Sequence, residues 1–343
     1  MKIDIYAFSG NGALLSDKLI EKLNEYEVNA YVPERYISSG RFVKLREENL
    51  YKATEKSFKN ADSIIFIGAV GIAVRAIAPF VKSKKYDPAV ICMDERGINV
   101  ISLLSGHIGG ANKLTLKIAE IVDGNPIITT ATDVNGKFAV DEWASSRNLH
   151  IMSLKRARDI AAYILENKKI GFVSDYLVNG QLPSEIDLCE EEIGICVSLD
   201  SNKSPFNNTL NLIPKIVSVG VGCRKGTEFK DIYTAIMEVL NKHNISHFAV
   251  KCINSIDLKK EEEGIERTAE IFKVPYYTYS KDELSEIQGH FSNSDFVKSV
   301  AGVDTVCERA AIMSSNSKRL IISKTIVNSV TVAAAIDEYE VKF

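Results

Sequence analysis

The chain has 343 residues, of which 45% are hydrophobic and 25% charged, which suits about two to three domains with a sizeable buried core. A formal net charge of −3 argues against a protein that coats nucleic acid or an anionic membrane. No run of about 18 uncharged apolar residues occurs, so no membrane span is expected. The six cysteines form no C-x-x-C pair, which disfavours disulfides and structural zinc and predicts a cytoplasmic protein.

Short apolar runs alternate with amphipathic helical patterns in the first part of the chain. The expected strands span residues 2–8, 28–32, 63–67, 89–93, 99–103 and 126–130. The expected helices span residues 13–25, 46–58, 71–78 and 111–122. Strands that are apolar throughout indicate a sheet covered on both faces. We therefore expect a Rossmann-like α/β domain over residues 1–133.

The rest of the chain predicts two further α/β segments. Residues 134–213 form a small middle domain with a helix at 154–166 and strands at 169–173 and 193–199, and the polar stretch 201–208 is a candidate linker. Residues 214–343 form a separate C-terminal α/β domain. Its expected elements are a strand that ends at Gly220, helices at 227–242 and 259–272, and strands at 247–251 and 276–279. The charged run 259–263 is read as the first turns of its helix.

Three glycine-containing loops join a strand to a helix, at residues 10–12, 68–71 and 220–226. Backbone N–H groups at a helix start can bind an anion, although a tight turn without a ligand is the simpler interpretation of any one loop. In the third loop Arg224 and Lys225 add positive charge. None of the loops is followed by a Walker Lys-Ser/Thr pair, so a nucleotide-dependent enzyme is disfavoured. Cys223 is interpreted as a small buried residue rather than a nucleophile.

The densest set of reactive side chains lies between residues 94 and 141. His107 belongs to the string LLSGHIGGAN at 103–112, and Asp133 ends the string TTATD at 129–133. Both follow an expected strand, and open α/β sheets bind ligands at the carboxyl ends of their strands. The alternatives are a loop histidine bonded to backbone and an Asp133 that caps a helix or turn. No G-x-S-x-G elbow supports Ser105 as a nucleophile.

These strings, with GAVGIAVR at 68–75 and DERG at 94–97, closely resemble the N-terminal region of the CbiG family, the cobalt-precorrin-5A hydrolases of anaerobic cobalamin biosynthesis. The strings GVGCRKGT at 220–227, SVAGVD at 299–304 and VCERAA at 306–311, with Lys324, resemble its C-terminal domain, which CobE proteins share. The likeness spans nearly the whole chain. Arg309 departs from the proline that the family commonly has at that position, which puts a role for Glu308 in doubt.

The resemblance implies hydrolysis of the δ-lactone of cobalt-precorrin-5A, with release of acetaldehyde, to give cobalt-precorrin-5B. His107 or Asp133 would act as the base for water, and Ser105 or Thr130, with the N–H groups of Gly109 and Gly110, would stabilise the oxyanion. Substrate binding is then expected of a larger set that includes the cationic clamps. That set is Gly68, Gly71, Arg75, Asp94, Glu95, Gly109, Gly110, Asn112, Thr129, Gly222, Cys223, Arg224, Lys225, Glu308 and Lys324.

The cobalt would arrive within the corrinoid substrate, so no cofactor and no protein metal site are expected. A second copy of the chain or other cobalamin-pathway enzymes are the candidate protein partners, while nucleic acid and membrane are not expected. The alternative function is a non-catalytic carrier that shields a labile tetrapyrrole within the same pathway. Release of acetaldehyde by the purified protein would separate the enzyme from the carrier.

Overall fold

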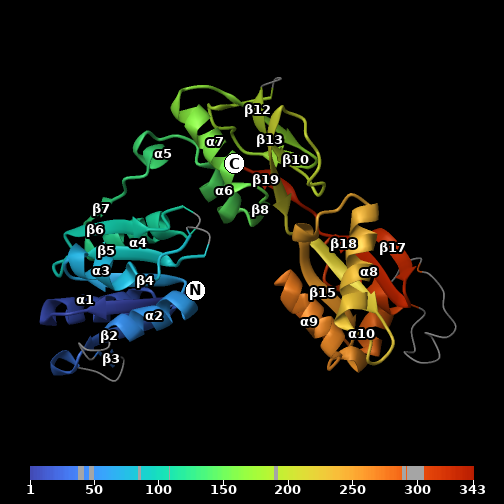
Figure 1. Ribbon diagram of the computed structural model, residues 1–343, viewed down its shortest axis with the longest axis horizontal. Helices are drawn as coiled ribbons and strands as arrows, with labels where there is room; N and C mark the ends of the chain where they lie inside the picture. Colours follow the sequence, from blue (N-terminus) through green and yellow to red (C-terminus); the bar gives the residue numbers. More distant parts are fainter. Residues whose placement is uncertain are drawn as a thin grey trace. The chain divides into compact units, whose positions relative to one another are not determined.

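The computed structural model describes residues 1–37, 42–45, 50–83, 86–107, 109–188, 192–287, 291 and 305–343. The chain divides into two compact units, Met1–Glu142 and Trp143–Phe343. Mostly parallel sheets covered by helices confirm the predicted α/β class (Figure 1). The division into three domains at residues 133 and 213 stays a prediction. No helix in the described part of the chain has the length and apolar character needed to cross a membrane.

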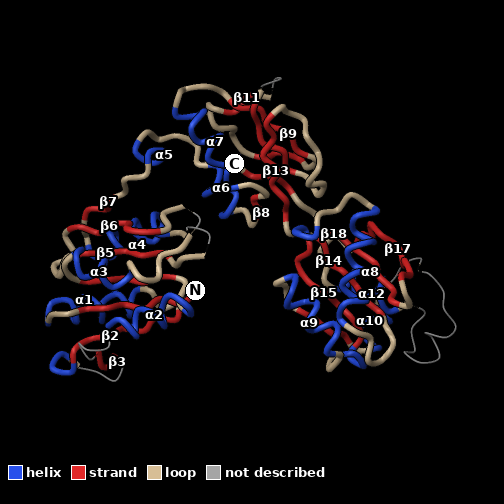
Figure 2. The backbone as a smooth tube through the Cα atoms, viewed as in Figure 1, coloured by secondary structure: helices blue, strands red, loops and turns tan. Residues whose placement is uncertain are grey.

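A seven-stranded sheet of order β3-β2-β1-β4-β5-β6-β7 forms the centre of the first unit. Its strands are β1 (Lys2–Ala7), β2 (Glu27–Pro33), β3 (Phe42–Leu45), β4 (Ser63–Ile67), β5 (Ala89–Met93), β6 (Asn99–Leu104) and β7 (Asn125–Ile127). The helices are α1 (Gly10–Lys22), α2 (Leu50–Asn60), α3 (Val70–Ile77), α4 (Ala111–Val122) and α5 (Ala131–Val134), with a 3₁₀ turn at Glu34–Tyr36. Helix α6 (Val140–Ser146) begins in this unit and ends in the second. Figure 2 shows the alternation of strands and helices.

Helices cover both faces of this sheet, which explains why its central strands are apolar at every position. Ile5 of β1 packs in one core cluster with residues of α1 and α4. Its neighbour Tyr6 points to the other face and packs in a second cluster with residues of α3. Successive side chains of a strand alternate between faces, so each face of β1 has its own helical layer.

The direction of β6 decides where the candidate residues lie. Strands β1 to β5 pair in parallel, whereas β5 and β6 pair antiparallel, with Val90 opposite Leu104 and Met93 opposite Val100. Strand β7 is parallel to β6. The carboxyl ends of β6 and β7 therefore lie at the edge of the sheet where β1 to β5 begin.

The second unit contains two five-stranded sheets. The first has the order β11-β9-β12-β13-β8, in which only β8 is antiparallel to its neighbour. Its strands are β8 (Leu149–Ile151), β9 (Ile170–Ser174), β11 (Ile186–Asp187), β12 (Ile193–Val197) and β13 (Asn208–Pro214). Helix α7 (Leu154–Leu165) packs on it, and its N-cap Ser153 accepts the Arg156 N–H.

The other sheet has the order β16-β15-β14-β18-β17. Its strands are β14 (Val217–Gly222), β15 (Val250–Ile256), β16 (Tyr276–Tyr279), β17 (Arg319–Val327) and β18 (Val330–Ile336). The helices are α8 (Phe229–Lys242), α9 (Glu263–Phe272), α10 (Lys281–Glu286) and α12 (Val306–Met313), with 3₁₀ turns at His247–Ala249 and Asp257–Lys259. Residues of α8 and α9 share one core cluster, and residues of α12 contribute to others.

The last strand forms a separate two-stranded sheet in this unit. Strand β19 (Glu340–Lys342) pairs with β10 (Leu177–Asn179), as Figure 1 shows. The ring of Phe343 stacks on Trp143 with 4.8 Å between centroids and meets Phe172 edge-on at 5.1 Å. The Trp143 Nε1–H donates to the Lys342 carbonyl at 3.0 Å. The chain thus passes more than once between the two five-stranded sheets of the second unit, and the contacts of Phe343 and Lys342 hold the second connection in place.

Most expected elements of the first part are found within a few residues, but two interpretations are wrong. Residues 201–208 are a packed loop between paired strands β12 and β13 rather than a linker, since Phe206 is buried over Gly171 and Gly194. The run 259–263 lies mostly before α9, in a 3₁₀ turn and the segment that follows it. Two parts of the sequence predictions lie outside the described residues. They are residues 46–49 of the second expected helix and residues 299–304 of the C-terminal strings. The residues from 305 onward are described and lead into α12.

Candidate functional site

The antiparallel hairpin of β5 and β6 divides the predicted residues of the first unit between two edges of the sheet. His107 follows β6 and Asp133 follows β7, and because these strands are parallel the two side chains meet at one edge. Gly68 and Gly71 follow β4, and their loop lies at the opposite edge, where the Gly68 N–H donates to Met93 O at 2.8 Å. The sheet therefore does not bring Gly68 and Gly71 together with His107, and their predicted role in substrate binding stays a prediction.

The other residues at the opposite edge have local structural roles. Asp94 closes the hairpin by accepting N–H bonds from Arg96, Ile98 and Asn99 at 2.7–3.2 Å. Burial alone would raise the pKa of Asp94, but these N–H bonds outweigh it and hold the pKa below its usual value. Glu95 is exposed, and so is Arg75, whose Nη1 donates to Gly71 O of its own helix at 3.4 Å.

The loop that carries His107 is held by its own backbone. The N–H groups of Ala111 and Asn112 donate to Ser105 O and Gly106 O at 3.1 and 2.9 Å, and the Gly110 N–H donates to His107 O at 2.9 Å. The Gly110 N–H is therefore engaged within the turn and is not the oxyanion donor that the sequence predicts. Of the two expected oxyanion donors, Gly109 N–H and Gly110 N–H, only the Gly109 N–H stays a prediction.

Ser105 faces away from the histidine. Its backbone is left-handed, with φ 59°, and its hydroxyl donates to Asp87 O at 3.1 Å in a buried position. It anchors the loop to the start of β5 and does not reach His107. The predicted catalytic role of Ser105 is not supported by this placement.

His107 lies between two carboxylates. Its Nε2 is 2.8 Å from Asp133 Oδ2 and its Nδ1 is 3.0 Å from Asp141 Oδ1. The side chain is 11% exposed, against 27% for Asp133 and 14% for Asp141. Hydrogen bonding to Asp141, opposed by burial and reinforced by Asp133, raises the pKa of His107 to about 9. The two carboxylates therefore stabilise the protonated, positively charged form of the imidazole.

A buried amide fixes Asp133 on its other side. Asn112, at the start of α4, is 3% exposed. Its Oδ1 accepts the Ser102 hydroxyl at 2.6 Å, and its Nδ2 donates to Thr130 Oγ1 and to Asp133 Oδ2, each at 3.2 Å. Both halves of the amide are thus engaged, so its orientation is set. The sequence places Asn112, Thr130 and Asp133 at one site, and the structure brings them together, while Thr129 is exposed beside them.

Two acidic residues of this site are not among the sequence predictions. Asp141 and Glu142 are in the first turn of α6, and Glu142 offers a carboxylate oxygen within 4.8 Å of ligand atoms of His107 and Asp133. We call His107, Asp133, Asp141 and Glu142 the His107 cluster. In the sequence, an acidic pair eight residues after Asp133 is only a weak indication of a site residue. Its proximity to His107 depends on the turn through Gly136, which the sequence pattern does not predict.

In the second unit, the loop after β14 presents Arg224 and Lys225 as exposed cations. The glycines before it serve close packing: a Cβ on Gly220 would lie 1.8 Å from Cys307 O, and one on Gly222 would lie 2.5 Å from Thr331 Oγ1. The Gly226 N–H donates to Glu262 Oε1 at 2.6 Å, so a carboxylate of the chain itself occupies that donor. Burial raises the pKa of the Cys223 thiol, which disfavours a nucleophile there.

Glu308 and Lys324 are neighbours in the second unit. Glu308 is 1% exposed and accepts the backbone N–H of Lys324 at 2.8 Å. Arg309, the departure from the family pattern, donates from Nη1 to the carbonyls of Leu284 and Ile287 at 2.9 and 2.7 Å. Arg309 therefore ties the end of α10 to α12, and α12 still begins at Val306 without a proline.

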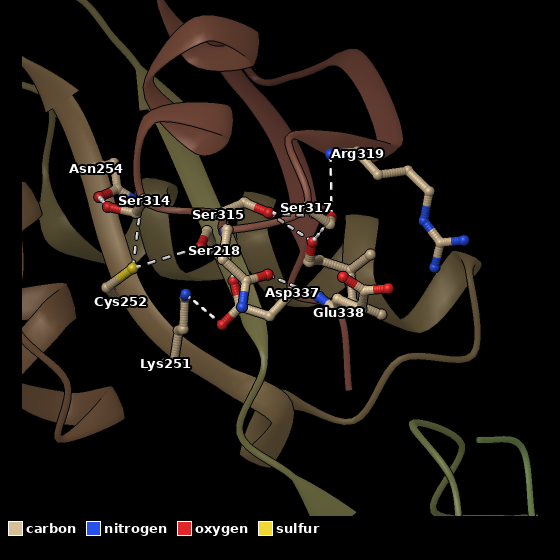
Figure 3. A network of polar contacts seen from close by, with 12 residues as sticks. Ser218, Lys251, Cys252, Asn254, Ser314, Ser315, Ser317, Arg319, Asp337 and Glu338 are labelled. Carbon is tan, nitrogen blue, oxygen red and sulfur yellow. Dashed lines mark hydrogen bonds and ion pairs between the residues drawn. The ribbon is translucent and has the colours of Figure 1, made fainter. Parts of the chain in front are cut away.

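A further polar network of this unit lies at the amino ends of β14 and β15 (Figure 3). Lys251 pairs with Asp337 at 2.5 Å, and the Ser314 hydroxyl donates to Asn254 Oδ1 at 2.6 Å. The loop with Arg224 follows the carboxyl end of β14, so this network is at the other edge of the sheet. It joins α12 to strands β15 and β18 and has a structural role.

A cavity of about 400 Å³ lies between the starts of α8 and α9. The Arg267 guanidinium covers the Phe229 ring on its wall, 4.1 Å from the ring centroid. Glu228, Glu262 and Glu263 also line it. Acidic and basic groups are thus mixed there, and the cavity shows no preference for an anion.

The site of the first unit defines a class: α/β proteins that present a histidine between carboxylates at an open sheet edge, a constellation suited to proton transfer or metal binding. The family models that match the chain are "Cobalamin synthesis G N-terminal" at residues 52–133, "Cobalamin biosynthesis central region" at 138–214 and "Cobalamin synthesis G C-terminus" at 217–335.

Two curated relatives agree with these models. A cobalt-precorrin-5A hydrolase of Salmonella typhimurium is 36% identical over 302 residues, which cover 81% of this chain and 85% of the relative. A cobalt-precorrin-5A hydrolase of Priestia megaterium is 30% identical over 302 residues, with 82% and 80% covered. A solved structure described as a cobalamin biosynthesis protein G homolog, from Sulfolobus solfataricus, covers 98% of this chain and 97% of its own at 25% identity, with a TM-score of 0.41. The chain belongs to the CbiG family of cobalamin biosynthesis, which confirms the predicted resemblance.

Proposed function

We propose that the chain is a cobalt-precorrin-5A hydrolase and that the His107 cluster is the place where water is activated. Two relatives that share most of its length carry that name. The observation that supports this site above the others is the contact of both imidazole nitrogens of His107 with carboxylates at 2.8 and 3.0 Å. Such an array can bind a water molecule and take part in moving its proton.

The proposed reaction consumes one water and releases acetaldehyde. The water oxygen adds to the lactone carbonyl, and the ring C–O bond then breaks to give a carboxylic acid and an alcohol. In the second step the alcohol loses its proton, and its oxygen forms the C=O bond of acetaldehyde as the bond from the carbinol carbon to the macrocycle breaks. The electron pair of that bond stays on the macrocycle, which takes up a proton. The enzyme is then a hydrolase whose overall reaction also cleaves a carbon–carbon bond.

The surroundings of the His107 cluster suit the oxyanion of the first step. Helix α4 begins at Ala111, directly after the loop that carries His107, so the positive end of its dipole lies at this edge of the sheet. The Gly109 N–H and the Thr130 hydroxyl are the donors that we assign to the oxyanion. Donors that are fixed before the reaction stabilise developing negative charge without reorganising. Asn112 holds Thr130 and Asp133 in place through its two amide hydrogen bonds.

Replacement of the central residues tests this assignment. His107→Ala and Asp133→Asn should each lower single-turnover release of acetaldehyde from cobalt-precorrin-5A by about 100-fold or more, since positioned proton-transfer groups contribute that much. Ser105→Ala is the matched control in the same loop, because its hydroxyl bonds Asp87 O instead of the cluster. It should keep most of the turnover. Wild-type rates in both cluster variants would contradict the assignment, and a protein that binds the corrinoid without releasing acetaldehyde would be a carrier.

A further inference from the structure

Three potential metal ligands converge in the His107 cluster. His107, Asp133 and Glu142 each offer one ligand atom, and these atoms lie within 4.8 Å of one another. His107 Nε2 and Asp133 Oδ2 are 2.8 Å apart. Two atoms that are each about 2.1 Å from one ion lie about 3 Å apart at a right angle, so this pair already has the spacing of neighbouring ligands.

Asp141 supplies the support that a ligating histidine needs. A histidine bound to a metal almost always donates its other ring N–H to a carboxylate or carbonyl, which fixes the tautomer and the orientation of the ring. Asp141 Oδ1 is 3.0 Å from Nδ1, on the far side of the ring from Asp133. When the ring proton is held on Nδ1 by Asp141, the lone pair of Nε2 is free to bind an ion that Asp133 and Glu142 also contact.

The charge of the cluster also favours a cation. Asp133, Asp141 and Glu142 bring three carboxylates to one imidazole. In the described part of the chain, neither Asp133 nor Glu142 forms an ion pair with a lysine or arginine. Glu142 is half-buried, so its carboxylate is partly removed from bulk water. A divalent ion would balance charge that the imidazole alone leaves uncompensated.

We propose that His107, Asp133 and Glu142 bind a divalent transition-metal ion, and that Asp141 positions His107 from outside the coordination shell. One imidazole with two carboxylates suits ions such as Mn²⁺, Fe²⁺, Co²⁺ or Zn²⁺, whereas Mg²⁺ prefers oxygen ligands alone. This further step rests on the proposed function: the ion holds the attacking water, because binding to a divalent ion can lower the pKa of water to about 7. This site is separate from the cobalt, which the substrate carries.

Titration with Mn²⁺ tests binding without the substrate. The electron paramagnetic resonance signal of the free ion measures how much Mn²⁺ stays unbound at each step. Mn²⁺ is the better probe than Zn²⁺ because thiolates select Zn²⁺ and the chain contains five described free cysteines. The metal-free full-length protein should bind one Mn²⁺ per chain and should bind Mg²⁺ much more weakly. His107→Ala should abolish this binding, and Glu142→Gln and Asp133→Asn should each weaken it by at least about tenfold. Asp141→Asn should weaken it by about 10–100-fold.

Glu120→Gln is the matched control, since Glu120 is an exposed carboxylate of α4 in the same unit. It should leave the Mn²⁺ affinity unchanged, and thermal unfolding should show that all variants fold. The absence of saturable Mn²⁺ binding, or equal affinity in the protein with Glu142→Gln and in the wild type, would overturn the proposed metal site.

The same protein separates this inference from the proposed function. Metal-free protein should release acetaldehyde slowly and recover when Mn²⁺ is added. If metal-free protein turns over at the full rate, the ion has no part in hydrolysis, and the link to the reaction is refuted. If Mn²⁺ binds as expected but neither form releases acetaldehyde, the proposed function fails and the metal site stands.

Discussion

Three glycines shape the loop that carries His107, for different physical reasons. A Cβ on Gly106 would lie 2.6 Å from Asn112 Oδ1, and one on Gly109 would lie 2.7 Å from the backbone oxygen of Ser105. Gly110 has open space around it but a positive φ of 82°. Two positions therefore need glycine for close approach and the third for its backbone conformation.

This difference predicts unequal effects of adding one methyl group. Gly109→Ala should lower turnover by more than about tenfold, because the Ser105 carbonyl, which anchors Ala111, must shift and move His107 with it. Gly110→Ala should keep most of the turnover and lower the free energy of unfolding by about 1–2 kcal/mol, the cost of a left-handed residue with a side chain. Acetaldehyde release and urea unfolding measure the two effects. Equal turnover in both variants would contradict this account of the loop.

At this scale the sequence predicts contacts between residues that follow neighbouring strands. His107 and Asp133 meet because each is placed after a strand, which apolar patterning reveals. Asp141 and Glu142 could not be assigned, because their position depends on the turn between α5 and α6, which no periodic pattern marks. The proximity of Ser105 to His107 in sequence predicts a catalytic role, but the left-handed backbone of Ser105 turns its hydroxyl to Asp87.

Among the elements, β6 shows that the length of a connection fixes the direction of a strand. Only residues 94–98 separate β5 from β6. A parallel connection needs a crossover of about a dozen residues, so a loop this short requires an antiparallel hairpin. That constraint alone places Gly68, Gly71 and Arg75 at the edge opposite His107. Apolar runs identify strands, but direction follows from the length of the connection.

The contact of β19 with β10 is a long-range feature that local patterning could not predict. It makes Phe343 part of an aromatic cluster with Trp143 and Phe172. Because Trp143 is the single tryptophan of the chain, its fluorescence reports directly on this contact.

Phe343→Ala should therefore destabilise the second unit and change the Trp143 emission. Loss of a half-buried phenylalanine ring should lower the free energy of unfolding by about 2 kcal/mol. Urea unfolding followed by Trp143 fluorescence measures this change. Lys342→Ala is the control, since only the backbone carbonyl of Lys342 contacts Trp143 and Arg147. If Phe343→Ala unfolds at the wild-type urea concentration, the contact with β10 does not stabilise the unit.

For the whole molecule, the question is how a chain of net charge −3 would bind the proposed substrate, a corrinoid whose side chains we expect to carry carboxylates. Long-range attraction cannot supply this affinity, so local cations must do so. Arg224 and Lys225 are exposed at the carboxyl end of β14, and Arg75 is exposed in the first unit at the sheet edge opposite His107. Within its own unit Arg75 is thus remote from His107, and we expect Arg224, in the loop that the sequence resemblance assigns to substrate binding, to contact the substrate instead.

Arg224→Gln should raise KM by roughly fivefold and make it less sensitive to salt, while kcat changes little. An exposed charge contact contributes about 1 kcal/mol, which salt screens, and about 1.4 kcal/mol corresponds to a factor of ten in affinity. Arg75→Gln removes the same charge and should leave KM unchanged at every salt concentration. Acetaldehyde release over a range of substrate and salt concentrations distinguishes the two. An equal rise of KM in both variants would mean that total charge governs binding, and an unchanged KM after Arg224→Gln would remove the loop after β14 from the substrate site.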